Sequence, residues 1–374
     1  VGPSAGATVP CLINEPAFTN PLDNPLRFPV AFPTTGTGGP STVGLPVANR
    51  PDLRVPFSMQ YSLTMERQQW NTGFRLTYTG TNTRQGVYRW DYNQPVADDR
   101  LYVDKPRAFP RYPAIPYTDN GAGHQYHGLS IEIERRNLRG LHYQFYYTLA
   151  KDVQDLENLE QPEDAYNRAR ERGTWGAIPR HRWQGNLIYD LPVGKGKAFG
   201  SNFGRWTNLI LGNWQLSAIY IYETGSAVTP LWTGPDPTGT RFSNNRTRPI
   251  VTLRPDRIAD GRLDNPTIER WFDISAFTAP PIGRFGNSGK GVIYGTPTNV
   301  LHGTLAKQIP IKERVTVRLE FLGNNVLNHP NYMNPNMVVN AAGTAGVVTA
   351  VMDRNARFDT GIPREMQAQL RVMW

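Results

Sequence analysis

Strict alternation of apolar and polar residues constrains this chain more than any other feature. From Leu141 to Leu149, apolar or aromatic residues fill every second position, and His142, Gln144, Tyr146 and Thr148 lie between them. Successive side chains of a strand point to opposite faces, so the pattern predicts a strand with one apolar face. The pattern recurs along the chain. It predicts strands at about 56–67, 71–82, 124–136, 140–151, 182–192, 208–223, 299–310, 313–324 and 364–374.

The connections between these predicted strands alternate between short and long. The tight turns are Gln69–Asn71, Asn137–Gly140 and Pro310–Glu313, and Pro192–Trp206 is intermediate. The long connections are Thr81–Gly123, Lys151–Arg180, Gly225–Thr298 and Asn324–Pro363. Loops this long are unusual in a compact soluble domain, whereas short periplasmic turns and long extracellular loops are typical of transmembrane barrels. The predicted fold is therefore all-β, an antiparallel transmembrane β-barrel in the bacterial outer membrane.

Composition excludes several other classes of protein. Apolar residues make up 39% of the chain, yet no run approaches the ~18 residues of a membrane helix. A barrel needs no such run, because only alternate strand residues face lipid. The net charge of +9 favours anionic lipid or polysaccharide contacts, and no nucleic-acid module accompanies it. Cys11, the single cysteine, cannot form an internal disulfide.

The predicted barrel is incomplete in this chain. About nine strands are expected, whereas single-chain bacterial barrels use even numbers. The first strand therefore needs a neighbour, supplied by upstream residues or by a second chain completing the wall. Residues 1–55 are rich in Pro and Gly and are predicted to be an extracellular loop or arm. Residues 56–374 are predicted to be the C-terminal part of the barrel.

Three sets of residues are candidates for functional roles. Charged residues on the polar faces are expected to line the lumen, either as a ladder that stabilises a wet wall or as contacts for a ligand or plug. Aromatic residues near strand ends are expected to form an interfacial girdle. The last strand closes on an aromatic residue and resembles the assembly signal of outer-membrane proteins. The lumen candidates are Arg75, Glu132, Glu134, Arg318, Glu320 and Arg371; the girdle is Trp183, Tyr189, Trp214 and Tyr222; the signal is Leu370, Val372 and Trp374.

No catalytic, cofactor or metal site is expected. His124 and His127 are three apart on a predicted strand, which places them on opposite faces and disfavours chelation. One outer loop carries an acidic cluster whose spacing matches no EF-hand, so it is expected to face water, with calcium as the alternative. Its members are Asp152, Asp155, Glu157, Glu160, Glu163 and Asp164. Gly194–Lys197 lacks a phosphate-loop pattern and is predicted to be a turn with basic, lipid-proximal side chains.

Several ordered motifs resemble those of Oar-like TonB-dependent receptors. They are His181–Gly194, Gly212–Ser217, Trp271–Phe277 with Phe285–Gly289, Arg314–Asn331 and Tyr126–Arg136. The resemblance runs in order over roughly residues 50–374. It implies a barrel of about 22 strands, closed by an N-terminal plug and opened by the TonB–ExbBD motor. Plug and TonB box would belong to a portion that these residues do not include.

The leading hypothesis is that this chain is the barrel portion of a TonB-dependent receptor, which imports a bulky solute across the outer membrane. Such a protein supplies gated binding, so no enzyme activity is expected. The alternative is a structural barrel that scaffolds a multi-chain surface assembly, with residues 1–55 lying on a neighbour. A plug-free diffusion porin is a third hypothesis. The expected partners are outer-membrane lipid and whatever completes the wall, and the resemblance adds TonB–ExbBD.

Overall fold

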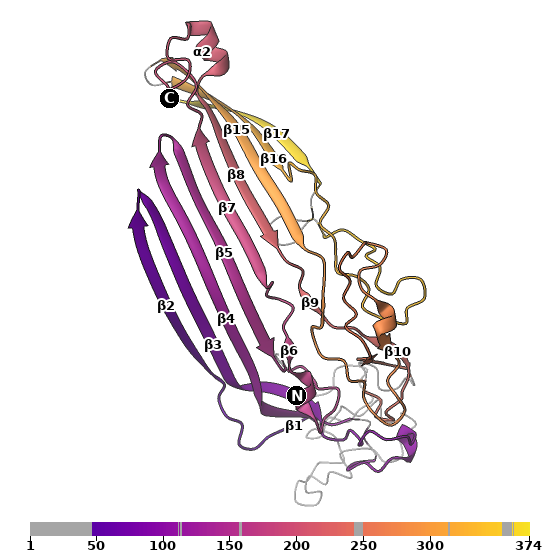
Figure 1. Cartoon of the computed structure of the whole chain (residues 1–374). Coiled ribbons are helices and arrows are strands. Elements are labelled where there is room, and N and C mark those ends of the chain that lie inside the picture. The colour runs from indigo at the N-terminus through magenta and orange to yellow at the C-terminus, as the bar shows by residue number, and fades with distance from the viewer. Residues whose placement is uncertain are drawn as a thin grey trace, which may run out of the picture.

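The computed structural model describes residues 47–110, 112, 114–156, 159–242, 250–312, 315–353, 361 and 363–374. An 11-stranded sheet dominates these residues, and Figure 1 shows it as one broad wall. Its main path is an antiparallel meander in which each strand pairs with its neighbours in sequence. These strands are β2 (Phe57–Gln69), β3 (Thr72–Asp91), β4 (Pro116–Leu138), β5 (Leu141–Gln154), β7 (His181–Asp190), β8 (Trp214–Glu223), β15 (Thr298–Lys312), β16 (Val315–Asn324) and β17 (Glu365–Met373).

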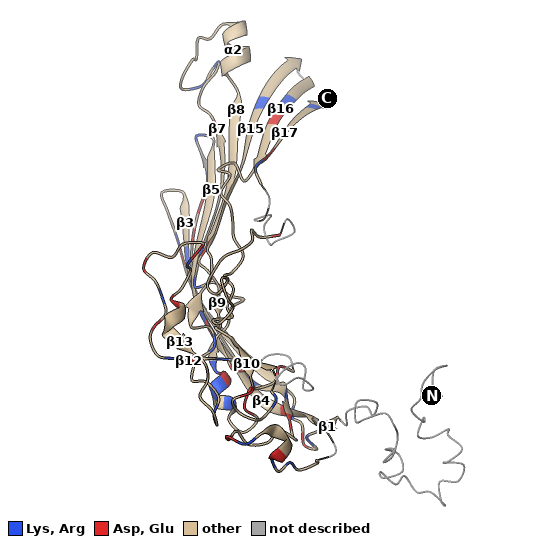
Figure 2. Cartoon of the chain, turned by 90° about the vertical axis from the view of Figure 1, so that its right-hand side faces the viewer, with Lys and Arg blue, Asp and Glu red and all other residues tan. Residues whose placement is uncertain are grey.

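The wall confirms the predicted strand order and does not close. Among the described residues, β2 and β17 each pair along one edge only. Two short strands lie off the main path: β1 (Ala48–Asn49) runs parallel to β4, and β6 (Gly173–Thr174) pairs with β5. Seen edge-on in Figure 2, the wall is a thin curved layer. No helix in the described part of the chain is long and apolar enough to cross a membrane.

Tight turns join the strands at one end of the wall. Between β2 and β3, Trp70 and Asn71 have φ values of 52° and 57°. Arg139 and Gly140 have φ values of 49° and 87° between β4 and β5. Positive φ at both central residues is the signature of the type I′ turn, whose twist matches that of the strands it joins. These two-residue turns fix the register of both hairpins.

The prediction of a strand over 208–223 is wrong in its first part. Residues Arg205–Leu211 form the short helix α2, and β8 begins only at Trp214. The run Leu209-Ile210-Leu211 breaks the alternation, and the Asn208 carbonyl accepts a helical hydrogen bond from Gly212 N. At the opposite end, β3 and β4 extend well beyond the predicted 71–82 and 124–136, so the connection between them is shorter than expected.

The register aligns like faces across the whole wall. Ile131 pairs with Leu76 and Tyr147, Tyr147 pairs with Trp183, and Trp183 pairs with Tyr222. These residues belong to one continuous apolar face. A single-layer wall has no core beneath it, so many of these side chains are exposed. The Leu63 side chain, for example, is 66% exposed. An exposed apolar band on one face of an antiparallel wall is the lipid-facing surface of a membrane barrel.

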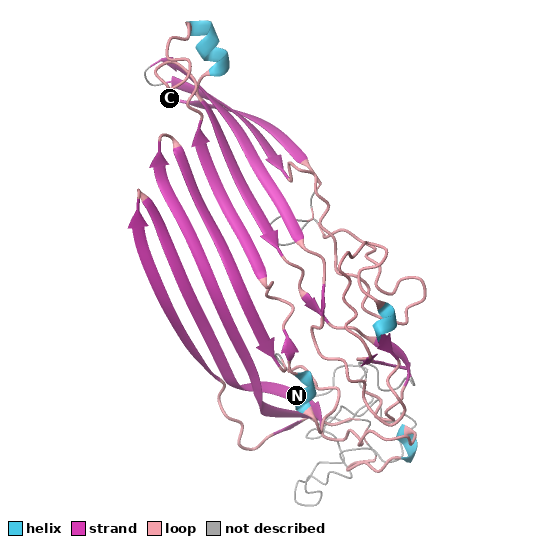
Figure 3. Cartoon of the chain, viewed as in Figure 1, coloured by secondary structure: helices cyan, strands magenta, loops and turns pink. Residues whose placement is uncertain are grey.

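The buried apolar core lies in the long loops, which gather at the end of the wall opposite the tight turns (Figures 1 and 3). Short strands stiffen them: β9 (Ala227–Val228) pairs with β14 (Ile293–Tyr294), β10 (Trp232–Pro235) with β11 (Ile250–Leu253), and β12 (Asp256–Arg257) with β13 (Phe277–Thr278). The largest cluster contains Phe272, Ala276, Phe277, Ile293 and Val339. These connections form a folded loop layer on the extracellular side of the wall.

Candidate functional site: the polar wall face and the loop layer

The polar face of the wall carries an ion triad across three strands. Arg75 on β3 lies 2.7 Å from Glu66 on β2 and 2.7 Å from Glu132 on β4. The three residues share one register row. Gln144 Nε2 on β5 also donates to Glu132 at 2.8 Å. Each charge therefore has a partner on the neighbouring strand, which stabilises the pairing of β2, β3 and β4.

The other predicted lumen residues lie on the same face. Glu134 pairs with Arg136 at 2.6 Å. On β16, Arg318 pairs with Glu320 at 2.6 Å and donates to Gln215 of β8 at 3.0 Å. Arg371 of β17 lies directly across from Arg318. The structure thus divides the six candidates into two groups, one near the β2 edge and one near the β17 edge. That these groups line a lumen stays a prediction.

The four predicted girdle residues lie on the apolar face at two heights. Trp183 and Tyr222 are register partners near the loop layer. Tyr189 and Trp214 lie near the tight turns. Trp183 and Tyr189 are six positions apart, which is about 20 Å of strand and, at the ~40° tilt of such strands, about 15 Å of the ~25 Å apolar band. Tyr147 packs on Trp183, with ring centroids 4.2 Å apart, and extends the upper row.

The predicted assembly signal lies at the free edge of the sheet. Leu370 and Val372 face Leu319 and Val317 across the β16–β17 pair. Trp374 follows the strand and is 91% exposed. Its ring therefore contributes little to packing in this chain.

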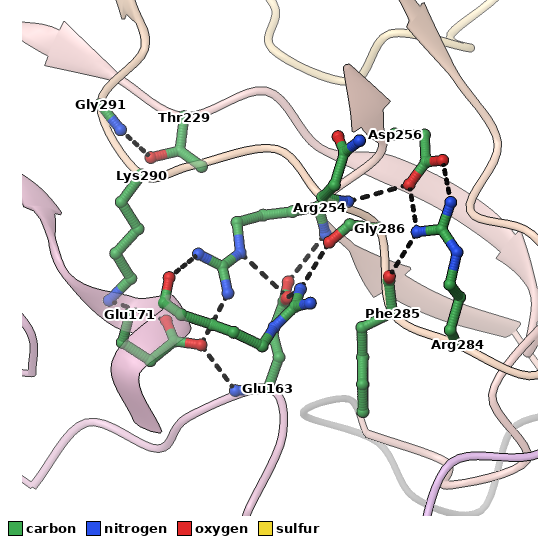
Figure 4. A network of polar contacts seen from close by, with 12 residues as sticks. Glu163, Glu171, Thr229, Arg254, Asp256, Arg284, Phe285, Gly286, Lys290 and Gly291 are labelled. Carbon is green, nitrogen blue, oxygen red and sulfur yellow. Dashed lines mark hydrogen bonds and ion pairs between the residues drawn. The ribbon is translucent and has the colours of Figure 1, made fainter. Parts of the chain in front are cut away.

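The centre of the loop layer is a buried ionic network that the sequence did not reveal (Figure 4). Arg254 follows β11 and donates to Glu163 at 2.9 Å and to Glu171 at 2.7 Å. Lys290 reaches the other Glu171 oxygen at 3.3 Å and Glu160 at 3.0 Å. The network joins the β5–β7 loop to the β8–β15 loop, segments far apart in sequence. Burial raises the pKa of Glu171, although Arg254 and Lys290 oppose that rise.

A second buried cation ties another pair of loops together. The Lys105 side chain, between β3 and β4, is 0% exposed. Its ammonium donates to the carbonyls of Val96 at 2.8 Å and Thr238 at 2.6 Å, and it lies 2.9 Å from Asp98. Hydrogen bonds from Arg100 and then Lys105 hold the pKa of Asp98 well below its usual range. The β3–β4 loop is thereby fixed to the β8–β15 loop.

The expectation that the acidic cluster of residues 152–164 faces water is wrong for part of it. Asp152 is buried against His124 at 2.5 Å, and Glu163 is buried in the Arg254 network. Asp155 contacts Arg168 at 3.4 Å. Glu157 lies outside the described residues. The cause is pairing with side chains from other segments, His124 for Asp152 and Arg254 for Glu163, which local sequence cannot show.

His124 and His127 lie on opposite faces of β4, as strand geometry requires. His127 Nδ1 contacts the Tyr78 hydroxyl at 2.8 Å, away from Asp152. No group of three or more metal-ligating side chains occurs among the described residues. A 630 Å³ pocket opens beside the buried network, and Trp175, Thr229, Glu160 and Lys290 are among its lining residues.

The motifs that resemble the receptor family build this layer. Phe272 and Phe277 meet edge-on at 5.9 Å in the main cluster. Asp273 accepts a hydrogen bond from Ser275 N and caps the turn between them. Gly286 passes so close to the Arg254 carbonyl that a Cβ there would lie 2.2 Å from it. These loop motifs therefore specify packing within the layer.

A membrane wall with an apolar belt, a charged opposite face and a folded loop layer defines an outer-membrane barrel. Residues 4–367 match the family described as outer membrane beta barrel domain. The chain belongs to this family, which places it in the bacterial outer membrane.

Two solved outer-membrane proteins are similar in structure. The FrpB iron transporter from Neisseria meningitidis (F3-3 variant) matches with 11% identity and a TM-score of 0.39, over 87% of this chain and 32% of its own. The outer membrane transporter YddB from Escherichia coli matches with 10% identity and a TM-score of 0.41, over 88% of this chain and 34% of its own. The chain thus spans about a third of each structure. No curated protein matches it.

Proposed function

We propose that this chain is the barrel portion of a TonB-dependent receptor of the Oar-like group, which imports a bulky solute across the outer membrane. The observation that carries the proposal is the loop layer. Two hydrophobic clusters lie within it, a third joins it to β3 and β4, and two buried cations tie its loops together. Ordered loops of this kind provide a preorganised extracellular binding surface.

The motif resemblance supports the same proposal independently of the loop geometry. It covers wall strands and loop segments in order, from Tyr126–Arg136 to Arg314–Asn331. In the proposal, solute binds first among the loops, near the pocket lined by Trp175 and Lys290. The polar wall face, with Arg75 and Glu132, then lines its passage. The protein supplies binding and a path, and no bond chemistry.

The remaining wall, the plug and the contact with TonB–ExbBD are assigned to a portion outside these residues. The experiment is a structure of the native particle extracted from membranes, with intact mass measured on the same sample. The expected result is one polypeptide that closes about 22 strands around a plug. A lumen without a plug, or a wall closed by a different polypeptide, contradicts import by this mechanism.

The alternative is a structural barrel that scaffolds a multi-chain surface assembly, and it differs from the receptor in which polypeptide pairs with β2. Among the described residues β2 pairs only with β3, and its side chains are exposed along nearly its whole length. An unpaired edge of this length can accept a strand from another chain. The same native structure separates the two functions, because it identifies the polypeptide that pairs with β2.

A further inference from the structure

An exposed apolar helix lies at the tight-turn end of the wall. The helix α2 projects beyond the strand ends in the connection between β7 and β8 (Figure 1). Trp206 is 74% exposed and Ile210 66%. Leu211 and, just upstream, Phe199 are also exposed. A cluster of large exposed apolar side chains marks a surface that is covered in the working protein.

The helix is fixed to the end of the lipid-facing surface. Trp214 Nε1 donates to the Ile210 carbonyl at 3.0 Å, and Lys195 N donates to Asn208 Oδ1 at 2.7 Å. Trp214 opens β8 on the apolar face, in the same set as Leu216, which pairs with Leu305. The apolar surface of α2 therefore continues the apolar belt of the wall at its periplasmic rim.

Basic residues surround this apolar surface. Residues 191–213 contain Lys195, Lys197 and Arg205 and no Asp or Glu. All three basic side chains are exposed. Large apolar residues flanked by Lys and Arg are the pattern of a helix that lies in a membrane interface, where the cations reach lipid phosphates.

We propose that α2 and Phe199 form an interfacial anchor that binds phospholipids with anionic headgroups in the periplasmic leaflet. Continuity with the apolar belt favours lipid over a protein partner, and the uniformly positive charge favours anionic headgroups. The anchor is expected to hold the β7–β8 connection against the membrane. The proposal rests on the outer-membrane location and is independent of what the barrel imports.

The first test measures lipid contact directly. The full-length protein, with Cys11→Ser and any other cysteine removed, carries Trp206→Cys labelled with a nitroxide-sensitive fluorophore. It is reconstituted into phosphatidylcholine–phosphatidylglycerol bilayers containing spin-labelled phospholipid. Strong quenching of the label at position 206 is expected. Asn202→Cys, exposed in the same connection but outside the helix, is the control and should respond mainly to a water-soluble quencher.

Two outcomes of this test overturn the anchor. If the water-soluble quencher reaches position 206 as easily as 202, the helix lies in the periplasm. If neither quencher reaches it, another protein surface covers α2. Trp206→Ser, assayed for barrel assembly by heat-modifiable gel migration, shows separately whether the apolar residue is needed for folding.

The second test measures headgroup preference. Lipid retained by the purified protein is quantified after exchange into equal amounts of phosphatidylglycerol and phosphatidylcholine. The triple variant Lys195→Gln, Lys197→Gln, Arg205→Gln should lose about fivefold in preference for the anionic lipid per charge removed. Arg257→Gln, Arg262→Gln, Arg270→Gln makes the same charge change in the loop layer and should leave the preference unchanged. No preference in the unaltered protein contradicts the anionic specificity.

Discussion

Arg254 and Glu171 form a 2.7 Å ion pair between two different extracellular loops. Both residues are nearly inaccessible to solvent, with exposures of 2% and 1%. Burying two charges is costly unless each is paired and hydrogen-bonded. Here the guanidinium also donates to Glu163 and to the Arg170 carbonyl. The pair therefore makes the folding of one loop depend on the position of the other.

Replacing Arg254 should loosen the loop layer and leave the wall intact. Arg254→Met leaves the buried carboxylates of Glu163 and Glu171 without their shared cation. Removing one partner of a buried ion pair lowers the free energy of unfolding by about 3–5 kcal/mol. Hydrogen exchange in residues 159–180 and 250–257 should accelerate, while the wall strands keep their protection. Arg262→Met is the matched control. Arg262 is half exposed, and its ion pair with exposed Asp260 is long, at 3.7 Å, so its loss should have little effect. Equal protection in both variants would contradict a structural role for the network.

Glu171 should give the loop layer an unusual pH dependence. Its folded pKa lies above the ordinary value of 4.5 because burial disfavours the carboxylate. A carboxyl group with a raised folded pKa stabilises the fold fully below pH 4.5, and that contribution is lost as pH rises through the folded pKa. Asp98 has the opposite sign, since its lowered pKa adds stability above its ordinary value of 3.8 and loses it on acidification.

The pH ranges in which Glu171 and Asp98 change the stability do not overlap, so the two contributions can be measured separately. Local opening of residues 159–180, followed by hydrogen exchange with correction for intrinsic rates, should become easier as pH rises from 4.5. Glu171→Gln should flatten that slope. Asp98→Asn should flatten the slope below pH 3.8 and lower the stability by a constant amount above it. An unchanged slope in Glu171→Gln would mean that another group sets the dependence.

The wall could be predicted from sequence, and the loop layer could not. Strand alternation is local, so Leu141–Leu149 alone identifies its strand and its two faces. The pairing of Arg254 with Glu163 and Glu171 depends on tertiary contacts more than 80 positions apart, and nothing in their spacing marks it. The alternation of β8 predicts a strand that reaches back through Leu209–Leu211, where the structure has α2; three successive apolar residues there break the strand period.

Removing the C-terminal aromatic residue should slow assembly of the barrel. Trp374 is almost fully exposed, so its loss removes little packing. If the last strand is an assembly signal, Trp374→Ala should reduce the rate at which heat-modifiable protein appears in the outer membrane. Trp70→Ala, at a residue 77% exposed in a turn at the same end, should assemble normally. Equal assembly rates in Trp374→Ala and Trp70→Ala would contradict a role for Trp374 in assembly.

Neighbouring residues on opposite faces of β4 provide the sharpest test of which face meets lipid. Ile131 lies on the apolar face between Leu76 and Tyr147, and Ser130 lies on the other face between Thr77 and Thr148. Ile131→Arg should destabilise the folded barrel, because a cation on the lipid-facing side costs about 2–4 kcal/mol at the bilayer midplane and about 0–1 kcal/mol near the interface. Ser130→Arg adds the same charge to the wet face and should be tolerated. Reversible urea unfolding of the full-length protein in vesicles gives both values. A larger penalty at Ser130 would reverse the assignment of the two faces. Arg75 and Glu132 would then face lipid, where charged side chains are costly and an ion triad is not expected.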